Sequence, residues 1–349
     1  MTKTEMEAKM REACHRGVAL FEDAPCYPVE PLVRLFHLGR DFGKQTDEAV
    51  MEGMLEEYRS ILQTIRPIEK APERIYLWPE GKMPKNTDYT DNSDYKYNHD
   101  PDFKPYLYEM LVPEEVEPKG AVVLCAGGDH GDASFHEAFQ SCRDLNDLGY
   151  QCFLLLNRTH RCPWSKQECG ADAARAIRMI RANAAKYRIS SGRVSFAGFS
   201  NGGVTGEACI RYYSGKQTVK DHFPEYEPDW LDEYKGAPDS FLCIYGPRWA
   251  TEEFDYTGVV YPPTFFAVGR DDTAMDNLNH TYPDLAAHGV ELEVHTFAGV
   301  PHGKAGVKLV GEEGYDNFHL WLPLGDAFMQ DVYRKAEAKK RDEMQGKSE

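Results

Sequence analysis

A serine between glycines stands where a short apolar segment gives way to a helix-forming one, and this junction constrains the fold more than any other feature. Residues 193–197 (RVSFA) have the β-branched and aromatic character of a buried strand, and residues 203–210 (GVTGEACI) can open a helix. Between them, Gly198-Phe199-Ser200-Asn201-Gly202 fits the G-x-S-x-G pattern of a nucleophile held on a sharp strand-to-helix turn. The pattern also arises by chance, and a serine between glycines is usually a turn residue. The evidence for a nucleophile therefore comes from the predicted strand and helix on either side of it. The sequence therefore predicts that Ser200 is a raised nucleophile, with the Asn201 amide facing any anion formed beside it.

An acid and a base follow this serine in the chain. The apolar run at residues 264–268 ends in Gly269-Arg270-Asp271-Asp272, and the alternating segment 291–297 leads into a loop with His302 between a proline and a glycine. A serine hydroxyl needs a base such as His302 to take its proton, and an acid fixes the tautomer of that histidine. We prefer Asp272 to Asp271, because Asp272 lies one residue further out and Asp271 could cap the following helix. The alternative for His302 is a solvated surface group.

A glycine-rich loop offers backbone donors for an oxyanion. Residues 120–125 (GAVVLC) form a continuous apolar run typical of a central parallel strand. The run ends in Ala126-Gly127-Gly128-Asp129-His130-Gly131, where the backbone can approach a substrate closely. We take the amides of Gly128 and Asp129, together with that of Asn201, as the predicted oxyanion hole.

These segments resemble the α/β-hydrolases of the acetyl esterase and feruloyl-esterase-like group, which is related to acetyl xylan esterases. The resemblance covers about residues 72–335 and includes residues 74–81 (RIYLWPEG), residues 178–184 (RMIRANA), the glycine loop and the Ser200, Asp272 and His302 sites. It implies a carboxylic ester hydrolase with a serine acyl-enzyme, acting on short acyl or aromatic acyl esters such as acylated carbohydrates or glycosides. The chain departs from the group at Ala126 and Asp129, where the group usually has His or Pro and a third glycine.

The order of segments predicts the domain organisation. Strands that alternate with helices indicate an α/β fold with a mostly parallel central sheet and helices on both faces. We expect a helical N-terminal extension at residues 1–70, followed by a catalytic domain at residues 71–340 with a cap insertion near 216–238. The clearest helix of the extension is predicted from about Asp47 to Arg66, with Thr46 as its N-cap. Its apolar stripe packs on the catalytic domain, or else forms a homodimer surface or a cover over the active site.

Several side chains are candidates for the substrate pocket, and they are His130, Arg161, Trp164 and Trp249. In the cap insertion, Tyr226, Trp230 and Tyr234 either bind planar acyl groups or sugar rings, or only anchor the cap. The polar residues around His130 could be mistaken for a metal cluster, but their spacing fits no ligand pattern, so we expect a polar pocket rim and no metal or cofactor.

Composition excludes several classes of protein. A formal net charge of −17 argues against nucleic acid and anionic membranes as partners. The resemblance to esterases implies a small-molecule ester as the partner instead. No apolar run approaches the ~18 residues of a membrane span, and the charged first residues do not fit a signal peptide, so a cytoplasmic location is predicted. The nine cysteines are scattered without a C-x-x-C pair, which indicates neither a disulfide framework nor a zinc site.

Two other functions remain open from the sequence. One is a serine peptidase related to prolyl oligopeptidase, although that family usually carries a propeller or strand-rich domain, and the roughly 70 N-terminal residues here are predicted to be helical. The other is a non-catalytic binding protein that retains the α/β-hydrolase fold. Peptide and ester turnover would separate the two enzymes, and labelling of Ser200 by a fluorophosphonate would reveal whether that serine is activated.

Overall fold

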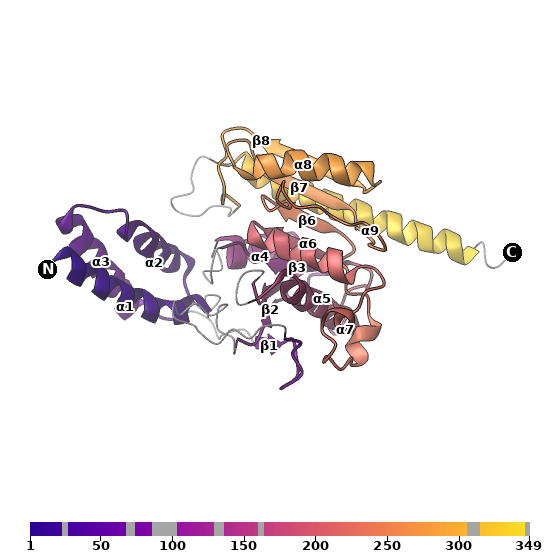
Figure 1. Ribbon diagram of the computed structural model, residues 1–349, viewed down its shortest axis with the longest axis horizontal. Helices are drawn as coiled ribbons and strands as arrows, with labels where there is room; N and C mark the ends of the chain where they lie inside the picture. Colours follow the sequence, from indigo (N-terminus) through magenta and orange to yellow (C-terminus); the bar gives the residue numbers. More distant parts are fainter. Residues whose placement is uncertain are drawn as a thin grey trace.

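A computed structural model describes residues 1–22, 27–67, 74–85, 103–128, 136–159, 164–305 and 315–345 of the 349-residue chain. These residues contain one eight-stranded sheet (Figure 1). Its strands are β1 (Arg74–Tyr76), β2 (Tyr106–Met110), β3 (Gly120–Cys125), β4 (Tyr150–Leu156), β5 (Val194–Phe199), β6 (Phe241–Ile244), β7 (Thr264–Gly269) and β8 (Leu292–Phe297).

The strand order in the sheet is β1-β2-β4-β3-β5-β6-β7-β8. Strands β4, β3, β5, β6, β7 and β8 pair in parallel, while β2 pairs antiparallel with both β4 and β1. The predicted mostly parallel sheet is therefore confirmed. Because the carboxyl ends of the parallel strands meet at one edge, the loops that follow β3, β5, β6, β7 and β8 are brought together there.

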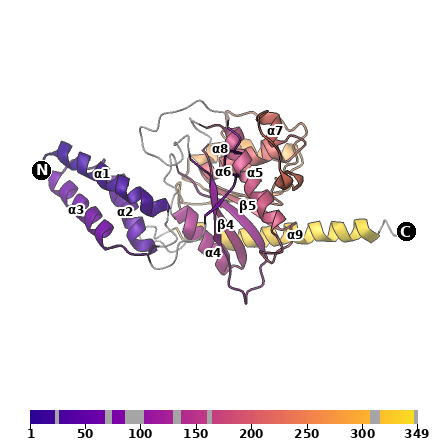
Figure 2. The same ribbon diagram turned by 90° about the horizontal axis from the view of Figure 1, so that it is seen from below.

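Helices cover both faces of the sheet, as expected. In chain order they are α1 (Lys3–Glu22), α2 (Val29–Phe42), α3 (Glu48–Thr64), the π-helical turn η3 (His136–Gln140), α4 (Ser141–Asp147), α5 (Lys166–Ala182), α6 (Asn201–Tyr213), α7 (Val219–His222), the 3₁₀ turn η4 (Trp230–Glu233), α8 (Ala274–Ala287), the 3₁₀ turn η5 (Phe318–Leu320) and α9 (Trp321–Gln345). Figure 2 shows α5, α6 and α8 on one face of the sheet and α4 and α9 on the other.

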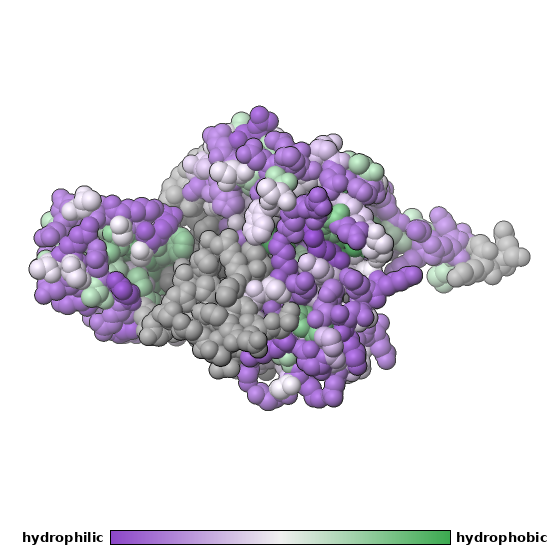
Figure 3. Space-filling view, viewed as in Figure 1, coloured by the Kyte–Doolittle hydropathy of each residue, from purple (hydrophilic) through white to green (hydrophobic). Residues whose placement is uncertain are grey.

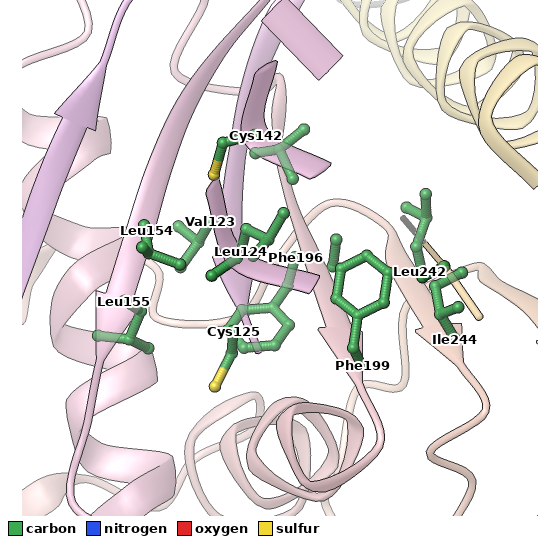
Figure 4. Packing of buried hydrophobic residues seen from close by; sticks show 14 of the residues in the cluster. Val123, Leu124, Cys125, Cys142, Leu154, Leu155, Phe196, Phe199, Leu242 and Ile244 are labelled. Atoms are coloured by element: carbon green, nitrogen blue, oxygen red, sulfur yellow. The ribbon is translucent and has the colours of Figure 1, made fainter. Parts of the chain in front are cut away.

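The core is centred on the middle strands, because those strands have helices on both sides. Every residue of β3, β4, β5, β6 and β7 is buried, which explains why these strands are mostly apolar in sequence. Figure 4 shows buried side chains of neighbouring strands, among them Val123 and Leu124 of β3, Phe196 of β5 and Leu242 of β6, which all belong to one hydrophobic core. Strand β8 lies at the edge of the sheet and is only partly buried.

Helices α1, α2 and α3 precede the sheet and pack on one another (Figure 1). The apolar stripe of α3, with Met51, Leu55 and Tyr58, is buried. The stripe was expected to pack on the catalytic domain, to form a homodimer surface or to cover the active site, whereas α3 packs on α1 and α2 in the described residues. The N-cap prediction was wrong by one residue, because the Asp47 side chain accepts hydrogen bonds from the amides of Ala49 and Val50. A homodimer through these helices remains a prediction.

The surface seen in Figure 3 is largely hydrophilic, in keeping with the acidic composition. Hydrophobic residues gather on the side of the N-terminal helices that faces the sheet-containing part of the molecule (Figure 3). Among the described residues, no helix combines the length and the apolar character that crossing a membrane requires.

An ion pair with both side chains fully buried joins the end of β4 to α5. Both the Arg158 and Asp172 side chains are 0% exposed. The Arg158 guanidinium donates from Nη2 to Asp172 Oδ1 at 2.7 Å and from Nε to Oδ2 at 3.0 Å, and the Trp78 indole donates to the same carboxylate at 2.8 Å. The pair therefore fixes the loop after β4, at the carboxyl edge of the sheet, against the helix that follows it.

We expect Arg158→Ala to lower the free energy of unfolding by about 3–5 kcal/mol, because it leaves the Asp172 carboxylate buried without its cation. Urea unfolding followed by circular dichroism measures this change. The control is Arg34→Ala, which removes an ion pair with Glu57 whose side chains are 53% and 43% exposed, and it should cost no more than about 1 kcal/mol. Equal losses in the two variants would contradict the assigned role of the buried pair.

Candidate active site

Ser200 lies on the tight turn between β5 and α6. Its backbone has φ 49° and ψ −117°, a left-handed conformation that non-glycine residues rarely adopt. There is no room for side chains around it, since a Cβ on Gly198 would lie 2.3 Å from the Gly202 carbonyl oxygen and a Cβ on Gly202 would lie 2.0 Å from that of Cys125. The two glycines of the motif are therefore required by close backbone approach.

The structure brings Ser200, Asp272 and His302 together at the carboxyl edge of the sheet. His302 Nε2 lies 2.9 Å from Ser200 Oγ, and His302 Nδ1 lies 2.8 Å and 2.9 Å from the two carboxylate oxygens of Asp272. Since a carboxylate only accepts hydrogen bonds, Nδ1 carries the proton in the neutral ring and Nε2 is left to accept from the serine hydroxyl. The arrangement is that of a nucleophile, a base and an orienting acid.

The two neighbouring aspartates have different surroundings. The Asp272 side chain is 0% exposed, and besides His302 it accepts a hydrogen bond from the Ala274 amide at the start of α8. Asp271 is exposed, and its backbone amide donates to the Val300 carbonyl. The geometry thus favours Asp272 as the partner of His302.

The electrostatic environment raises the pKa of His302 above its usual value. Partial burial of the ring acts in the opposite direction, because it disfavours the charged form. The hydrogen bond and the negative charge of Asp272 outweigh this effect, and the charge of Glu137 adds to them. An imidazolium at this position is therefore stabilised, as a base that takes a proton from serine requires.

The glycine loop after β3 is held at two consecutive residues. The Gly127 amide donates to Glu137 Oε2 at 2.5 Å, so this N–H points away from any substrate. The Gly128 carbonyl accepts from the Asn201 side-chain amide at 2.6 Å, and Gly128 has φ 114°, which L side chains rarely adopt. Asn201 is the first residue of α6, where backbone amides point out of the helix end toward a bound anion. The remaining predicted donor, Asp129, lies outside the described residues.

The four predicted pocket residues differ in where the structure places them. Trp164 is 4% exposed, and its ring lies 5.6 Å from the Arg158 guanidinium, so it packs against the buried ion pair. Trp249 is 39% exposed, with the Lys166 ammonium 4.6 Å from its ring. His130 and Arg161 lie outside the described residues. Of the four candidates, Trp249 is the one with an exposed ring in the part of the chain that the structure describes.

The cap insertion packs along α5. Arg175, Arg178 and Arg181 of that helix form ion pairs with Asp229, Asp232 and Asp239, respectively. Among the insertion's aromatic residues, Tyr226 is buried with its ring edge-on to Trp78, whereas Trp230 is 59% exposed and contacts Tyr234. Tyr226 therefore anchors the insertion, the second of its two predicted roles.

Sequence reasoning missed two residues beside the site. Glu137 is buried in η3, and Tyr245 follows β6 with φ 39°. The Tyr245 hydroxyl donates to Glu137 Oε1 at 2.8 Å, and its ring lies edge-on to His302 with 4.9 Å between ring centres. One signal was available for Tyr245, because it directly follows a buried parallel strand and so reaches the same edge as Ser200.

Neither a metal nor a reactive thiol is indicated in the described part of the chain. No group of three or more His, Cys, Asp or Glu side chains there is placed to hold a metal ion. Burial raises the pKa of the Cys125 thiol to about 12 and that of the Cys243 thiol well above its usual value. These cysteines therefore stay protonated and act as core residues.

The sheet order, the covering helices and the turn at Ser200 define the α/β-hydrolase fold, and solved structures show the same fold. An acetyl ester-xyloside bifunctional hydrolase from Caldicellulosiruptor lactoaceticus is 22% identical, with a TM-score of 0.56 over 74% of this chain and 96% of that one. Esterase 2 of Thermogutta terrifontis, phosphonylated by cyclosarin, is 17% identical, with a TM-score of 0.54 over 76% of this chain and 96% of that one. The predicted resemblance to esterases of this fold is thus confirmed at the level of the fold.

One curated protein also matches part of the chain. Endo-1,4-beta-xylanase B of Butyrivibrio fibrisolvens is 29% identical over 157 residues, which are 44% of this chain. The chain covers only 23% of the length of that xylanase. No protein-family model matches the chain.

Proposed function

We propose that the protein is a serine-dependent carboxylic ester hydrolase. The observation that carries this proposal is the continuous path of contacts from Asp272 through His302 to Ser200, with 2.9 Å between His302 Nε2 and Ser200 Oγ. The fold supports it as well, because the solved structures that share this fold include esterases.

In the first half of the reaction, Ser200 Oγ attacks the ester carbonyl carbon while His302 Nε2 takes the hydroxyl proton. The oxyanion that forms is held by the amides of Asn201 and Gly128, with Asp129 as the further donor that the sequence predicts. The C–O bond to the alcohol then breaks, and the imidazolium gives its proton to the leaving alkoxide. An acyl-serine and a free alcohol result.

In the second half, water attacks the acyl-serine carbonyl while His302 takes one of its protons. The second oxyanion occupies the same site as the first. When it collapses, the proton returns to Ser200 Oγ and the carboxylic acid leaves. Asp272 keeps the imidazole in one tautomer throughout and balances its charge in each transition state.

We further propose that the substrate is a short acyl or aromatic acyl ester on a carbohydrate. Two similar proteins support this proposal, because one is an acetyl ester-xyloside hydrolase and the other is a xylanase. We assign the stacking of a sugar ring to Trp249, because this residue is 39% exposed and follows β6 at the carboxyl edge of the sheet, beside the Lys166 ammonium that lies 4.6 Å from its ring.

The raised pKa of His302 predicts a specific pH dependence. Since His302 must be neutral to accept the serine proton, kcat/KM should fall as the pH drops through this pKa. The midpoint of the acid limb should lie above about 6.5, the ordinary histidine value. A pH profile of kcat/KM for a neutral ester measures it, and a midpoint near or below 6 would contradict the environment described for His302.

Covalent labelling and turnover together test the proposed function. A fluorophosphonate probe should add to Ser200 in one-to-one stoichiometry, as mass spectrometry of the digested protein would show. p-Nitrophenyl acetate, p-nitrophenyl butyrate, methyl ferulate and acetylated xylo-oligosaccharides are compared with a peptide p-nitroanilide. Ester turnover well above peptide turnover supports the proposal, faster peptide turnover indicates a serine peptidase, and no label with no turnover indicates a non-catalytic protein.

A further inference from the structure

A second carboxylate lies buried beside the catalytic groups. Glu137 is 2% exposed and belongs to the π-helical turn that precedes α4. Its two carboxylate oxygens accept hydrogen bonds from the Gly127 amide and the Tyr245 hydroxyl. Both donors are neutral, so among the described residues Glu137 is bound without a cation next to its charge.

The hydrogen bond from the Gly127 amide to Glu137 holds the oxyanion loop in place. A Cβ on Gly127 would lie 2.3 Å from Glu137 Oε2 and 2.8 Å from the Cβ of Ser200, so the loop passes directly between the two residues. Because the Gly127 amide is bound to Glu137 and the Gly128 carbonyl to Asn201, two consecutive residues of the loop are fixed in direction.

The hydrogen bond from the Tyr245 hydroxyl connects the same carboxylate to the surroundings of His302. Tyr245 is fully buried, follows β6 in a left-handed conformation, and presents its ring edge-on to His302. Cys125, Phe199 and Ile244, which precede the loop, the nucleophile and Tyr245, lie toward the same end of three adjacent strands (Figure 4). Glu137 thus connects loops from two strands that flank the strand of the nucleophile.

We propose that Glu137 is a positioning residue of this active site: it fixes the oxyanion loop at Gly127, holds Tyr245 against His302, and adds its negative charge to that of Asp272 near the imidazolium. This inference rests on the proposed function. The Glu137 carboxylate then has two roles with different requirements. Hydrogen bonding to Gly127 requires only an acceptor, whereas stabilising the imidazolium requires a negative charge.

The charges around His302 support the second task. Asp272 contacts the ring from the loop after β7, Tyr245 lies against it after β6, and Glu137 acts from η3 behind Tyr245. Of these groups, Asp272 and Glu137 both raise the pKa of His302, and burial raises the pKa of Tyr245 so that it stays neutral. Loss of the Glu137 charge should therefore make the imidazolium less stable.

Two substitutions at one position separate the tasks. Glu137→Gln keeps an oxygen that can accept from the Gly127 amide but removes the charge. It should retain kcat within about tenfold at pH 8–9, while the acid limb of kcat/KM moves to lower pH by about half a unit to one unit. Glu137→Ala removes acceptor and charge together and frees the oxyanion loop at Gly127. It should lower kcat with little change in KM, by up to the about 10²–10³-fold that loss of an oxyanion donor costs.

Two further variants serve as controls. Tyr245→Phe removes one hydrogen bond to Glu137 and leaves its charge, so the pKa of His302 should not fall. Glu207→Gln removes a different buried carboxylate, which pairs with Arg248 and is not among the groups that act on His302. It should leave the pKa of His302 unchanged.

A measurement without substrate keeps the inference distinct from the proposed function. An NMR titration of the His302 imidazole, assigned by its absence in His302→Asn, gives its pKa in wild type and in each variant. A lower pKa in Glu137→Gln and in Glu137→Ala but not in Tyr245→Phe or Glu207→Gln, with loss of kcat in Glu137→Ala, supports the proposal. An unchanged pKa in Glu137→Gln, or full kcat in a folded Glu137→Ala, overturns it. If wild type hydrolyses no ester, the proposed function fails, while the titration still decides whether the Glu137 charge acts on His302.

Discussion

Ser200→Ala is expected to lower kcat for p-nitrophenyl acetate by about 10⁵- to 10⁶-fold, to the level set by the remaining oxyanion donors and substrate binding. The reason is that the attacking oxygen is lost, and a water in its place has neither the position of Oγ nor its contact with His302. Steady-state turnover, corrected for spontaneous hydrolysis, measures the loss.

Ser195→Ala is the matched control for this experiment, because it makes the same change on β5, the strand that leads into Ser200. Ser195 is fully buried, and its hydroxyl lies 2.6 Å from those of Ser240 and Tyr333, so its role is structural. This variant should lose about 1 kcal/mol of stability and keep its turnover. Substantial ester hydrolysis by a folded Ser200→Ala protein would refute the serine mechanism.

Asp272→Asn is expected to lower kcat at neutral pH by about 10⁴-fold. An asparagine amide can donate to His302 Nδ1, which favours the tautomer that carries its proton on Nε2 and cannot accept from serine. The substitution also removes the charge that stabilises the imidazolium. Single-turnover kinetics with p-nitrophenyl acetate measures the acylation step on which both effects act.

The neighbouring residue provides the comparison, because Asp271 is exposed and one position away. Asp271→Asn should change kcat less than about threefold. If instead Asp271→Asn were inactive and Asp272→Asn active, the pairing of acid and base described above would be wrong.

The fold was predictable from the sequence because its parallel strands are buried on both faces. The apolar run at residues 120–125 coincides with β3, and the run at residues 264–268 falls within β7. The turn at Ser200 was equally readable, since close backbone approach at Gly198 and Gly202 leaves glycine as the residue that fits.

Contacts between distant parts of the chain were not predictable in the same way. Glu137 lies 108 residues from Tyr245 in sequence, and nothing in its local sequence, Phe135-His136-Glu137-Ala138, marks it as buried. The pairing of Arg158 with Asp172 depends likewise on how the loop after β4 folds back on α5. The partners of such side chains are determined by tertiary packing, which hydrophobic periodicity and motif spacing do not reveal.

Smaller errors arose where two neighbouring residues offer the same chemistry. Thr46 and Asp47 are both good N-cap residues, and in the structure it is the Asp47 side chain that accepts from the first amides of α3. Trp164 illustrates the opposite problem, because an aromatic residue after a strand end suits a binding surface, yet its ring covers the Arg158 guanidinium.

The arginine row on α5 has a consequence for engineering this scaffold. Arg175, Arg178 and Arg181 each hold an aspartate between residues 229 and 239. A chimera that replaces this segment with a loop from another protein would leave three guanidinium groups with little access to water. Grafts that carry acids at matching positions should express as folded protein, whereas grafts without them should need the three arginines changed as well.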